Sequence, residues 1–180
     1  MDSHLLQILQ FEVERQCGFV LMAAEDIRRA LGCNDSGRVW YSVQALLVAA
    51  ANVSKLLWPP GRDLRKRGET LRDSLLVGDD SPIRGRGLRD AFEHFDERIE
   101  KWAQSSPRGA FVDSNIGLAG RIEIDAKSEK DYLRNFEPAT WTVTFWGDSY
   151  HLIPLVEAIR SLQQRAAIET RRPHRQQKHA

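Results

Sequence analysis

Two side chains within residues 88–102 could act together on a substrate: Arg89 and His94, which four residues separate. A histidine can take up and release a proton near neutral pH. An arginine stays cationic and can hold a phosphate group or the negative charge that develops on it. One residue of each type beside a phosphodiester suffices for metal-free cleavage of RNA, in which the 2′-hydroxyl attacks the phosphorus. The pair therefore indicates phosphodiester chemistry.

The residues around this pair have the spacing of an amphipathic helix, which we predict over residues 88–104. At about 100° per residue, one stripe of apolar side chains would face the core: Leu88, Ala91, Phe92, Phe95, Ile99 and Trp102. Arg89 and His94 lie off this stripe, about 140° apart around the helix axis. Both therefore flank the outward face, and packing in the core does not explain His94.

An ordinary solvated helix face is the competing interpretation of the same residues. Arg89 and Glu93 stand four positions apart, as do Asp90 and His94, and such pairs are common on surface helices. The residues alone leave both interpretations open.

The positive charge that RNA requires would come from outside this helix. The neighbours of His94 are acidic: Glu93, Asp96, Glu97 and Glu100. A path for an RNA backbone would draw its potential from basic residues elsewhere. The candidate RNA contacts are Lys55, Arg84 and Arg86. The alternative for these three is a solvated basic surface.

No metal site is predicted. The chain has no Glu-x-x-His motif and no pair of histidines at helical spacing. Asp90, His94 and Glu97 could form part of a carboxylate–histidine site, but the sequence shows no further ligands for it. We therefore expect neither a metal nor a cofactor.

Helical periodicity dominates the chain. We predict helices at residues 3–31, 37–58, 61–76, 88–104 and 150–168, and the second is the most apolar and so the most buried. Two antiparallel strands are expected at 121–125 and 141–146, where polar and apolar residues alternate. The predicted fold is mainly α: a bundle of four to five helices with a small two-stranded β element before the last helix.

Length and composition fit a single domain. The chain has 180 residues, of which 42% are apolar and 28% charged, and its net charge is +1. We assign residues 1–169 to this domain. Residues 170–180 carry four basic side chains and no acid, so we predict a disordered basic tail there.

Cysteine usage and hydropathy indicate a reduced, cytoplasmic protein with no membrane partner. Cys17 and Cys33 form no C-x-x-C motif. The longest apolar run, 45–53, is about half of a membrane span. The N-terminal residues show no signal-peptide pattern.

The run Arg89-Asp90-Ala91-Phe92-Glu93-His94 resembles the Arg-x4-6-His motif of the HEPN superfamily (higher eukaryotes and prokaryotes nucleotide-binding domains). A polar residue, here Asp90, often follows the arginine in that family. The resemblance implies a helical bundle that forms a homodimer and brings two motifs together at one cleft. It further implies a metal-independent endoribonuclease of toxin or defence type, with Arg89 and His94 catalytic and Asp90 supporting their orientation. An antitoxin or defence partner is implied as well.

The chain departs from some HEPN toxins at Asp96. Those toxins carry a tyrosine at that position, which a partner nucleotidyltransferase modifies, so this regulation is not expected here. The superfamily also contains members that bind RNA or nucleotides, or act as scaffolds, without cleaving. The alternative function is therefore a non-catalytic RNA-binding or protein-interaction scaffold. A metal-dependent enzyme built on a helical bundle is a third, more distant option.

Overall fold

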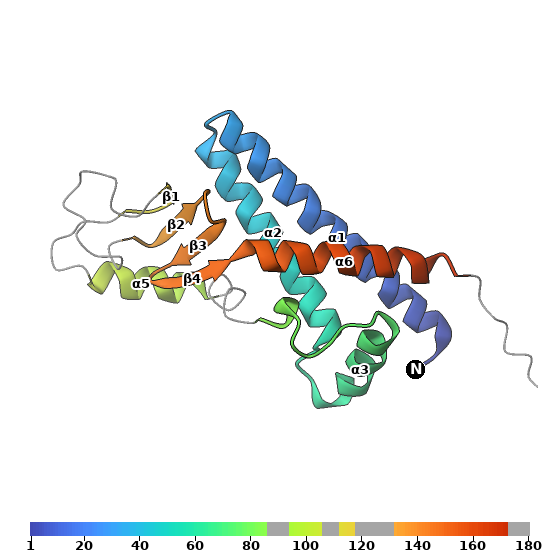
Figure 1. The fold of residues 1–180 in the computed structure, drawn as a ribbon. Helices are drawn as coiled ribbons and strands as arrows, with labels where there is room; N and C mark the ends of the chain where they lie inside the picture. The colour runs from blue at the N-terminus through green and yellow to red at the C-terminus, as the bar shows by residue number, and fades with distance from the viewer. Residues whose placement is uncertain (86–93, 106–111, 118–131, 173–180) are drawn as a thin grey trace, which may run out of the picture.

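A computed structural model of the chain describes residues 1–85, 94–105, 112–117 and 132–172. Two long helices, α1 (Ser3–Gly32) and α2 (Ser36–Leu57), form an antiparallel hairpin, and α6 (Leu152–Thr170) crosses it (Figure 1). A small sheet and the shorter helix α5 (Phe95–Ser105) lie beside the hairpin. The predicted mainly α class is confirmed.

Small and branched apolar side chains form the seam of the α1–α2 hairpin. In α1 the buried positions step by three or four residues: Leu9, Val13, Cys17, Val20, Ala24 and Ile27. The buried positions of α2 include Val39, Val43, Leu46, Ala50, Val53 and Leu57. Because this periodicity is strong, both helices begin and end within one residue of the predicted bounds.

Local side chains set the ends of α2. The Asp35 Oδ1 accepts a hydrogen bond from the amide of Arg38 at 2.9 Å and so caps the first turn. Asn34 adopts a φ of 55°, a left-handed conformation that asparagine tolerates better than most residues. At the other end, Pro59 has no N–H to continue the helix.

α2 has the largest buried share of the three long helices, as predicted, but one of its flanks is exposed. Tyr41 is 63% and Val48 53% exposed. The Ala, Val and Leu content of α2 predicts that the helix is buried. It does not say on how many sides other elements cover the helix.

The last helix packs against α1. The Thr170 hydroxyl donates to Glu14 Oε2 at 2.8 Å, and Gly18 lies close to Gln163. Apolar side chains along α6 join the main core: Leu152, Val156, Ile159, Leu162 and Ala166. The helix extends to Thr170, so the predicted start of the tail is helical, and residues 173–180 lie outside the described part of the chain.

The basic stretch predicted as a short helix forms a 3₁₀ turn, η1 (Arg62–Leu64), followed by α3 (Arg65–Ser74). Arg72 of α3 donates to the carbonyl of Leu57 at 2.6 Å, which ties α3 to the end of α2. A second 3₁₀ turn, η2 (Pro82–Arg84), buries Ile83 against α2 and α6.

We expect Gly68→Ala to destabilise the fold. A Cβ at position 68 would lie 2.5 Å from Pro59 Cδ and 2.7 Å from the carbonyl oxygen of Leu57, and neither atom can move easily. The free energy of unfolding should fall by about 1–3 kcal/mol, measured by urea titration. Gly18→Ala is the matched control, because its nearest neighbour is the flexible Gln163 side chain at 3.6 Å. Equal stability of the two variants would contradict the close approach at Gly68.

The small sheet has more strands than predicted. The described residues form β1 (Asn115–Ile116), β2 (Arg134–Glu137), β3 (Thr142–Phe145) and β4 (Asp148–His151), in the order β1-β2-β3-β4. β1 pairs in parallel with β2, and the other neighbours are antiparallel. The strand predicted at 141–146 corresponds to β3, whereas the one predicted at 121–125 lies outside the described residues.

A tight turn explains why the two-strand prediction missed β4. Trp146 and Gly147 have φ values of 47° and 90°, so a two-residue turn with left-handed backbone joins β3 to β4. A tryptophan is an unusual residue for such a turn, so the local residue types did not indicate it. Along β3, Val143 and Phe145 are buried and the two threonines are more exposed, which confirms the predicted alternation.

Aromatic and charged contacts join the sheet to the hairpin. Phe136 and Val143 are part of the main core, and the Trp40 indole donates to the carbonyl of Ser114 at 2.7 Å. Arg134 pairs with Asp113 across the sheet edge. Partial burial would raise the pKa of the Asp113 carboxyl, but the hydrogen bonds and charge of Arg134 outweigh it and hold that pKa below its ordinary value.

The two thiols should differ sharply in reactivity. Cys17 is fully buried in the α1–α2 seam, and burial, with the nearby Glu14 carboxylate, raises its pKa to about 12. Cys33 is exposed at the end of α1. Because the thiolate is the reactive form, a maleimide should label native protein once, and Cys33→Ser should abolish that label. Both thiols should react in urea, and rapid double labelling without denaturant would contradict the buried seam.

No helix among the described residues is long and apolar enough to cross a membrane.

Candidate functional site

His94 is a turn residue directly before α5, so of the helix predicted over residues 88–104 the structure describes the part from Phe95 onward. Its carbonyl accepts a hydrogen bond from the amide of Arg98 at 3.3 Å, which closes the first turn of α5. Residues 86–93 lie outside the described part of the chain. The predicted site residues Arg86, Arg89 and Asp90 fall among them, so the structure gives no geometry for the Arg89–His94 pair.

The His94 side chain is exposed and stands beside a carboxylate. It is 63% exposed, and its Nδ1 lies 3.7 Å from Glu97 Oε1. At this distance the protonated ring would form an ion pair with Glu97. A histidine can exchange a proton with a bound group through the ring nitrogen that does not face its partner. The His94 ring is therefore accessible to solvent and stands beside one carboxylate.

α5 is held on the sheet by a small second core. Trp102, Leu133 and Phe145 are buried together, and Ile99, Trp146 and Tyr150 pack around them. Two of the side chains predicted to face the core, Ile99 and Trp102, do so. Phe95 does not: it is 50% exposed, because it stands in the first turn, beyond the edge of this small core.

Arg98 joins the first turns of α5 to the β3–β4 turn. Its guanidinium lies 3.1 Å from Asp148 Oδ2 and 3.5 Å from the carbonyl oxygen of Phe145, and it stacks 5.3 Å above the Phe145 ring. The side chain is only 24% exposed, so this contact is partly shielded from water. Arg98 therefore positions the helix end that carries His94.

Acidic side chains surround His94, as the sequence indicated. Asp96 and Glu97 occupy the first turn of α5, where the positive end of the helix dipole favours them. Lys101 offsets part of this charge, with its Nζ 4.0 Å from Glu97 Oε2. The described surface next to His94 does not by itself attract a polyanion.

The predicted RNA contacts Lys55 and Arg84 line two neighbouring pockets. Lys55 lies with Arg67 in a groove of about 400 Å³, and Arg84 lies in a pocket of about 600 Å³. Pro59 and Pro60 contribute to the walls of both. The structure thus places Lys55 and Arg84 on opposite sides of one proline wall and not in a single site.

The Arg84 pocket contains an ion cluster that sequence reasoning missed. Asp79 Oδ1 accepts a hydrogen bond from the Trp58 indole at 3.0 Å and lies 3.7 Å from Arg72 and 3.5 Å from Arg84. The Trp58 hydrogen bond, followed by the charges of the two arginines, holds the pKa of Asp79 below its ordinary value. Nothing in the spacing of these residues predicted the cluster, because they come from four separate segments.

His151, the other internal histidine, borders an apolar cleft of about 390 Å³. Its Nδ1 lies 2.9 Å from the Thr142 hydroxyl, across the β3–β4 ladder. Ile83 and Gly85 line the same cleft. His151 occupies the N-cap position of α6 but makes no side-chain capping bond.

Within the described residues, no group of three or more His, Cys, Asp or Glu side chains is placed to hold a metal ion. Of the partial site considered above, Asp90 lies outside those residues, while His94 and Glu97 are adjacent.

No protein-family model, curated protein or solved structure matches the chain.

We expect Arg98→Ala to loosen α5 without unfolding the protein. The substitution removes the Asp148 ion pair and the contact with the Phe145 ring, each of which contributes on the order of 1 kcal/mol. Amide hydrogen exchange in α5 should accelerate about fivefold or more, while exchange in α1 and α2 stays unchanged. Lys101→Ala, on the exposed side of α5, is the control. Unchanged exchange in Arg98→Ala would show that the apolar contacts of Ile99 and Trp102 hold the helix without Arg98.

Proposed function

We propose that the chain is a HEPN-like RNA-processing protein. In this proposal it is a metal-independent endoribonuclease of toxin or defence type, using Arg89 and His94 at a cleft between two subunits. The observation that carries the proposal is the exposed imidazole of His94, set beside Glu97 at the start of an anchored helix. Its partner in the proposal is Arg89, which the Arg-x4-His spacing of the sequence identifies.

The proposed reaction forms one bond to phosphorus and breaks another. The 2′-hydroxyl loses its proton to an imidazole and attacks the adjacent phosphorus, and the 5′-oxygen leaves with a proton from an imidazolium. The products are a 2′,3′-cyclic phosphate and a free 5′-hydroxyl. Arg89 would stabilise the charge on the pentacoordinate phosphorus, and Asp90 would orient the pair. A second copy of the chain would bring a second Arg89–His94 motif to the same cleft, as the resemblance to the HEPN superfamily implies.

The proposed RNA contacts are Arg84, Arg86 and Lys55. Arg84 supports this assignment best, because Arg65 and Arg72 line the same pocket. An antitoxin or defence partner belongs to the same proposal and rests on the resemblance alone.

A non-catalytic scaffold is the second candidate function. The acidic residues at the start of α5 favour it, because Asp96 and Glu97 would repel an RNA backbone near His94. In that case the His94–Glu97 contact would be part of a protein-binding surface.

RNA cleavage in EDTA tests the proposal. Purified full-length protein should cleave a single-stranded RNA, leave the all-deoxy version intact, and yield 2′,3′-cyclic phosphate ends. His94→Ala and Arg89→Ala should each lower the rate by about 10²–10⁴-fold. The matched controls are His4→Ala on α1 and Arg160→Ala on α6, both exposed.

Two outcomes would count against catalysis. Equal cleavage by the wild type and both site variants would exclude Arg89 and His94 as the catalytic residues. Absence of cleavage under every condition, with folding confirmed by circular dichroism, would favour the scaffold.

A further inference from the structure

Three segments that lie apart in the sequence enclose the pocket that contains Arg72, Asp79 and Arg84. The first is the run from Trp58 to Gly61 that ends α2, the second is α3, and the third is the loop that leads into η2. The volume of about 600 Å³ is typical of sites that take small molecules. The pocket therefore has room for a ligand beside the ion pairs that border it.

One face of α3 lines this pocket. Arg65, Glu69 and Arg72 stand four and three positions apart, so successive turns of the helix bring them to the same side. Gly68 lies on this side as well, and its lack of a side chain lets α3 approach Pro59 closely. This contact holds the charged face of α3 against the proline wall that follows α2.

Arg72 is held in place by the protein itself. Its side chain is 13% exposed, and its Nη1 donates to the carbonyl of Leu57 at 2.6 Å. Its guanidinium lies 5.3 Å from the centre of a Trp58 ring, and its Nε lies 3.7 Å from Asp79 Oδ1. Among the described residues, its Nη2 has no hydrogen-bond partner. A ligand in the pocket would therefore meet a guanidinium that is already positioned.

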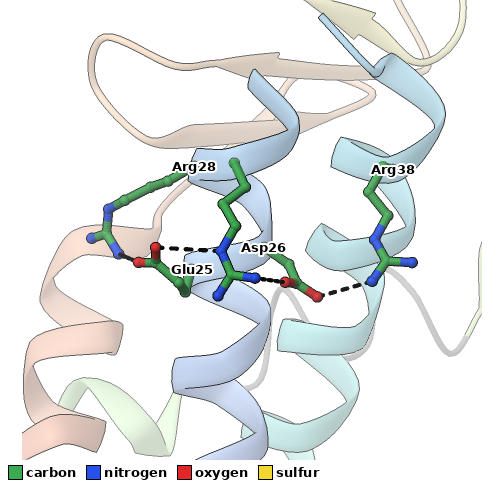
Figure 2. Close-up of polar contacts among 5 residues, drawn as sticks. Glu25, Asp26, Arg28 and Arg38 are labelled. Carbon is green, nitrogen blue, oxygen red and sulfur yellow. Dashed lines mark hydrogen bonds and ion pairs between the residues drawn. The ribbon is translucent and has the colours of Figure 1, made fainter. Parts of the chain in front are cut away.

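A second cluster of three arginines and two carboxylates, near the turn between α1 and α2, is fully paired (Figure 2). Glu25 pairs with Arg28 and Arg29, at 3.5 and 3.6 Å. Asp26 pairs with Arg29 and Arg38, at 3.6 and 3.0 Å. Every arginine of that cluster contacts a carboxylate of the same chain, so its charges need no ligand.

The pocket has the same number of charges, but they are not paired in this way. Arg72 and Arg84 share a single oxygen atom of Asp79, at 3.7 and 3.5 Å. In the described part of the chain, neither Arg65 nor Glu69 forms an ion pair, although both line the pocket. Three guanidinium groups face two carboxylates, an excess of one positive charge. A bound anion would complete this site.

The lining of the pocket defines the kind of anion. Guanidinium groups hold the oxygen atoms of a phosphate in a two-pronged geometry. Carboxylates repel a phosphate but accept hydrogen bonds from hydroxyl groups. The side chains of Trp58, Pro59 and Pro60 supply an apolar wall on which the C–H groups of a sugar can pack. A ligand that fits all three features carries a phosphate at one end and hydroxyl groups at the other.

We propose that this pocket binds a sugar phosphate, a small phosphate monoester with several hydroxyl groups. Arg65, Arg84 and the Nη2 of Arg72 hold the phosphate. Glu69 accepts hydrogen bonds from the hydroxyl groups, and Asp79 keeps the two arginines that it contacts in position. A continuous RNA backbone fits less well, because the two carboxylates repel each further phosphate.

This inference does not rest on the proposed ribonuclease function. The two proposals compete for Arg84, which is one of the RNA contacts proposed above. Binding of a sugar phosphate is measured with small molecules and without RNA, so either proposal can fail while the other stands.

Isothermal titration calorimetry of the full-length protein tests the site, with the terminal phosphate monoesters of ribose and of glucose as probes. At least one ester should bind. Inorganic phosphate and the two unphosphorylated sugars should bind at least about tenfold more weakly than that ester. Absence of binding by both esters at millimolar concentration, or equal affinity for inorganic phosphate, would overturn the proposal.

Arg65→Gln tests the phosphate contact. It should weaken binding of the ester at least about tenfold. The urea midpoint should stay unchanged, because Arg65 is exposed and forms no ion pair among the described residues. Lys66→Gln is the matched control: it removes the same charge from the next position of α3, which is exposed and outside the pocket. Equal weakening by both variants would reduce the effect to overall charge and reject the site.

Glu69→Gln separates hydroxyl recognition from simple repulsion. A carboxylate accepts stronger hydrogen bonds than an amide, so the variant should bind the ester about threefold or more weakly despite its more positive charge. The same variant should bind inorganic phosphate more tightly, because a repelling charge is gone. Tighter binding of both ligands would show that Glu69 only repels anions, and a sugar phosphate would then be rejected as the ligand.

Discussion

The apolar seam between α1 and α2 is the contact on which the rest of the molecule depends. Val13, Cys17 and Val20 are completely buried in it, and α6 and Ile83 of η2 pack on the helices it joins. The sheet is attached to the same hairpin through Phe136 and the Trp40 hydrogen bond. Because α6, η2 and the sheet all pack on these two helices, loss of the seam would unfold the whole domain. The contacts of α5, in contrast, can open locally.

A second consequence of the seam is an imbalance between its two sides. α6 covers one flank of the hairpin, and the described residues leave Tyr41 and Val48 exposed on the other.

His94 stands directly before α5, and α5 packs in the small second core on the sheet and not in the α1–α2 seam. α5 depends on Trp102 and Arg98 for its position, so His94 is held by a few contacts to the β3–β4 turn. A small, partly independent core of this kind allows a site to move without disturbing the hairpin. The acidic first turn stabilises α5 while it opposes an RNA backbone, so helix stability and the proposed activity make conflicting demands on Asp96 and Glu97.

The sequence by itself determined the long helices. Their apolar residues recur every three or four positions over several turns, and Asp35 and Pro59 mark the ends of α2 through local hydrogen bonding and ring geometry. It also identified β3 by alternation, and His94 as a polar-face residue. Only the tertiary structure decided the four-stranded sheet, the Asp79 cluster with its two arginines, the exposure of Phe95 and the bare flank of α2. Each of these depends on which distant segment comes to lie alongside, and periodicity records that a residue is apolar or charged but not which neighbour it meets.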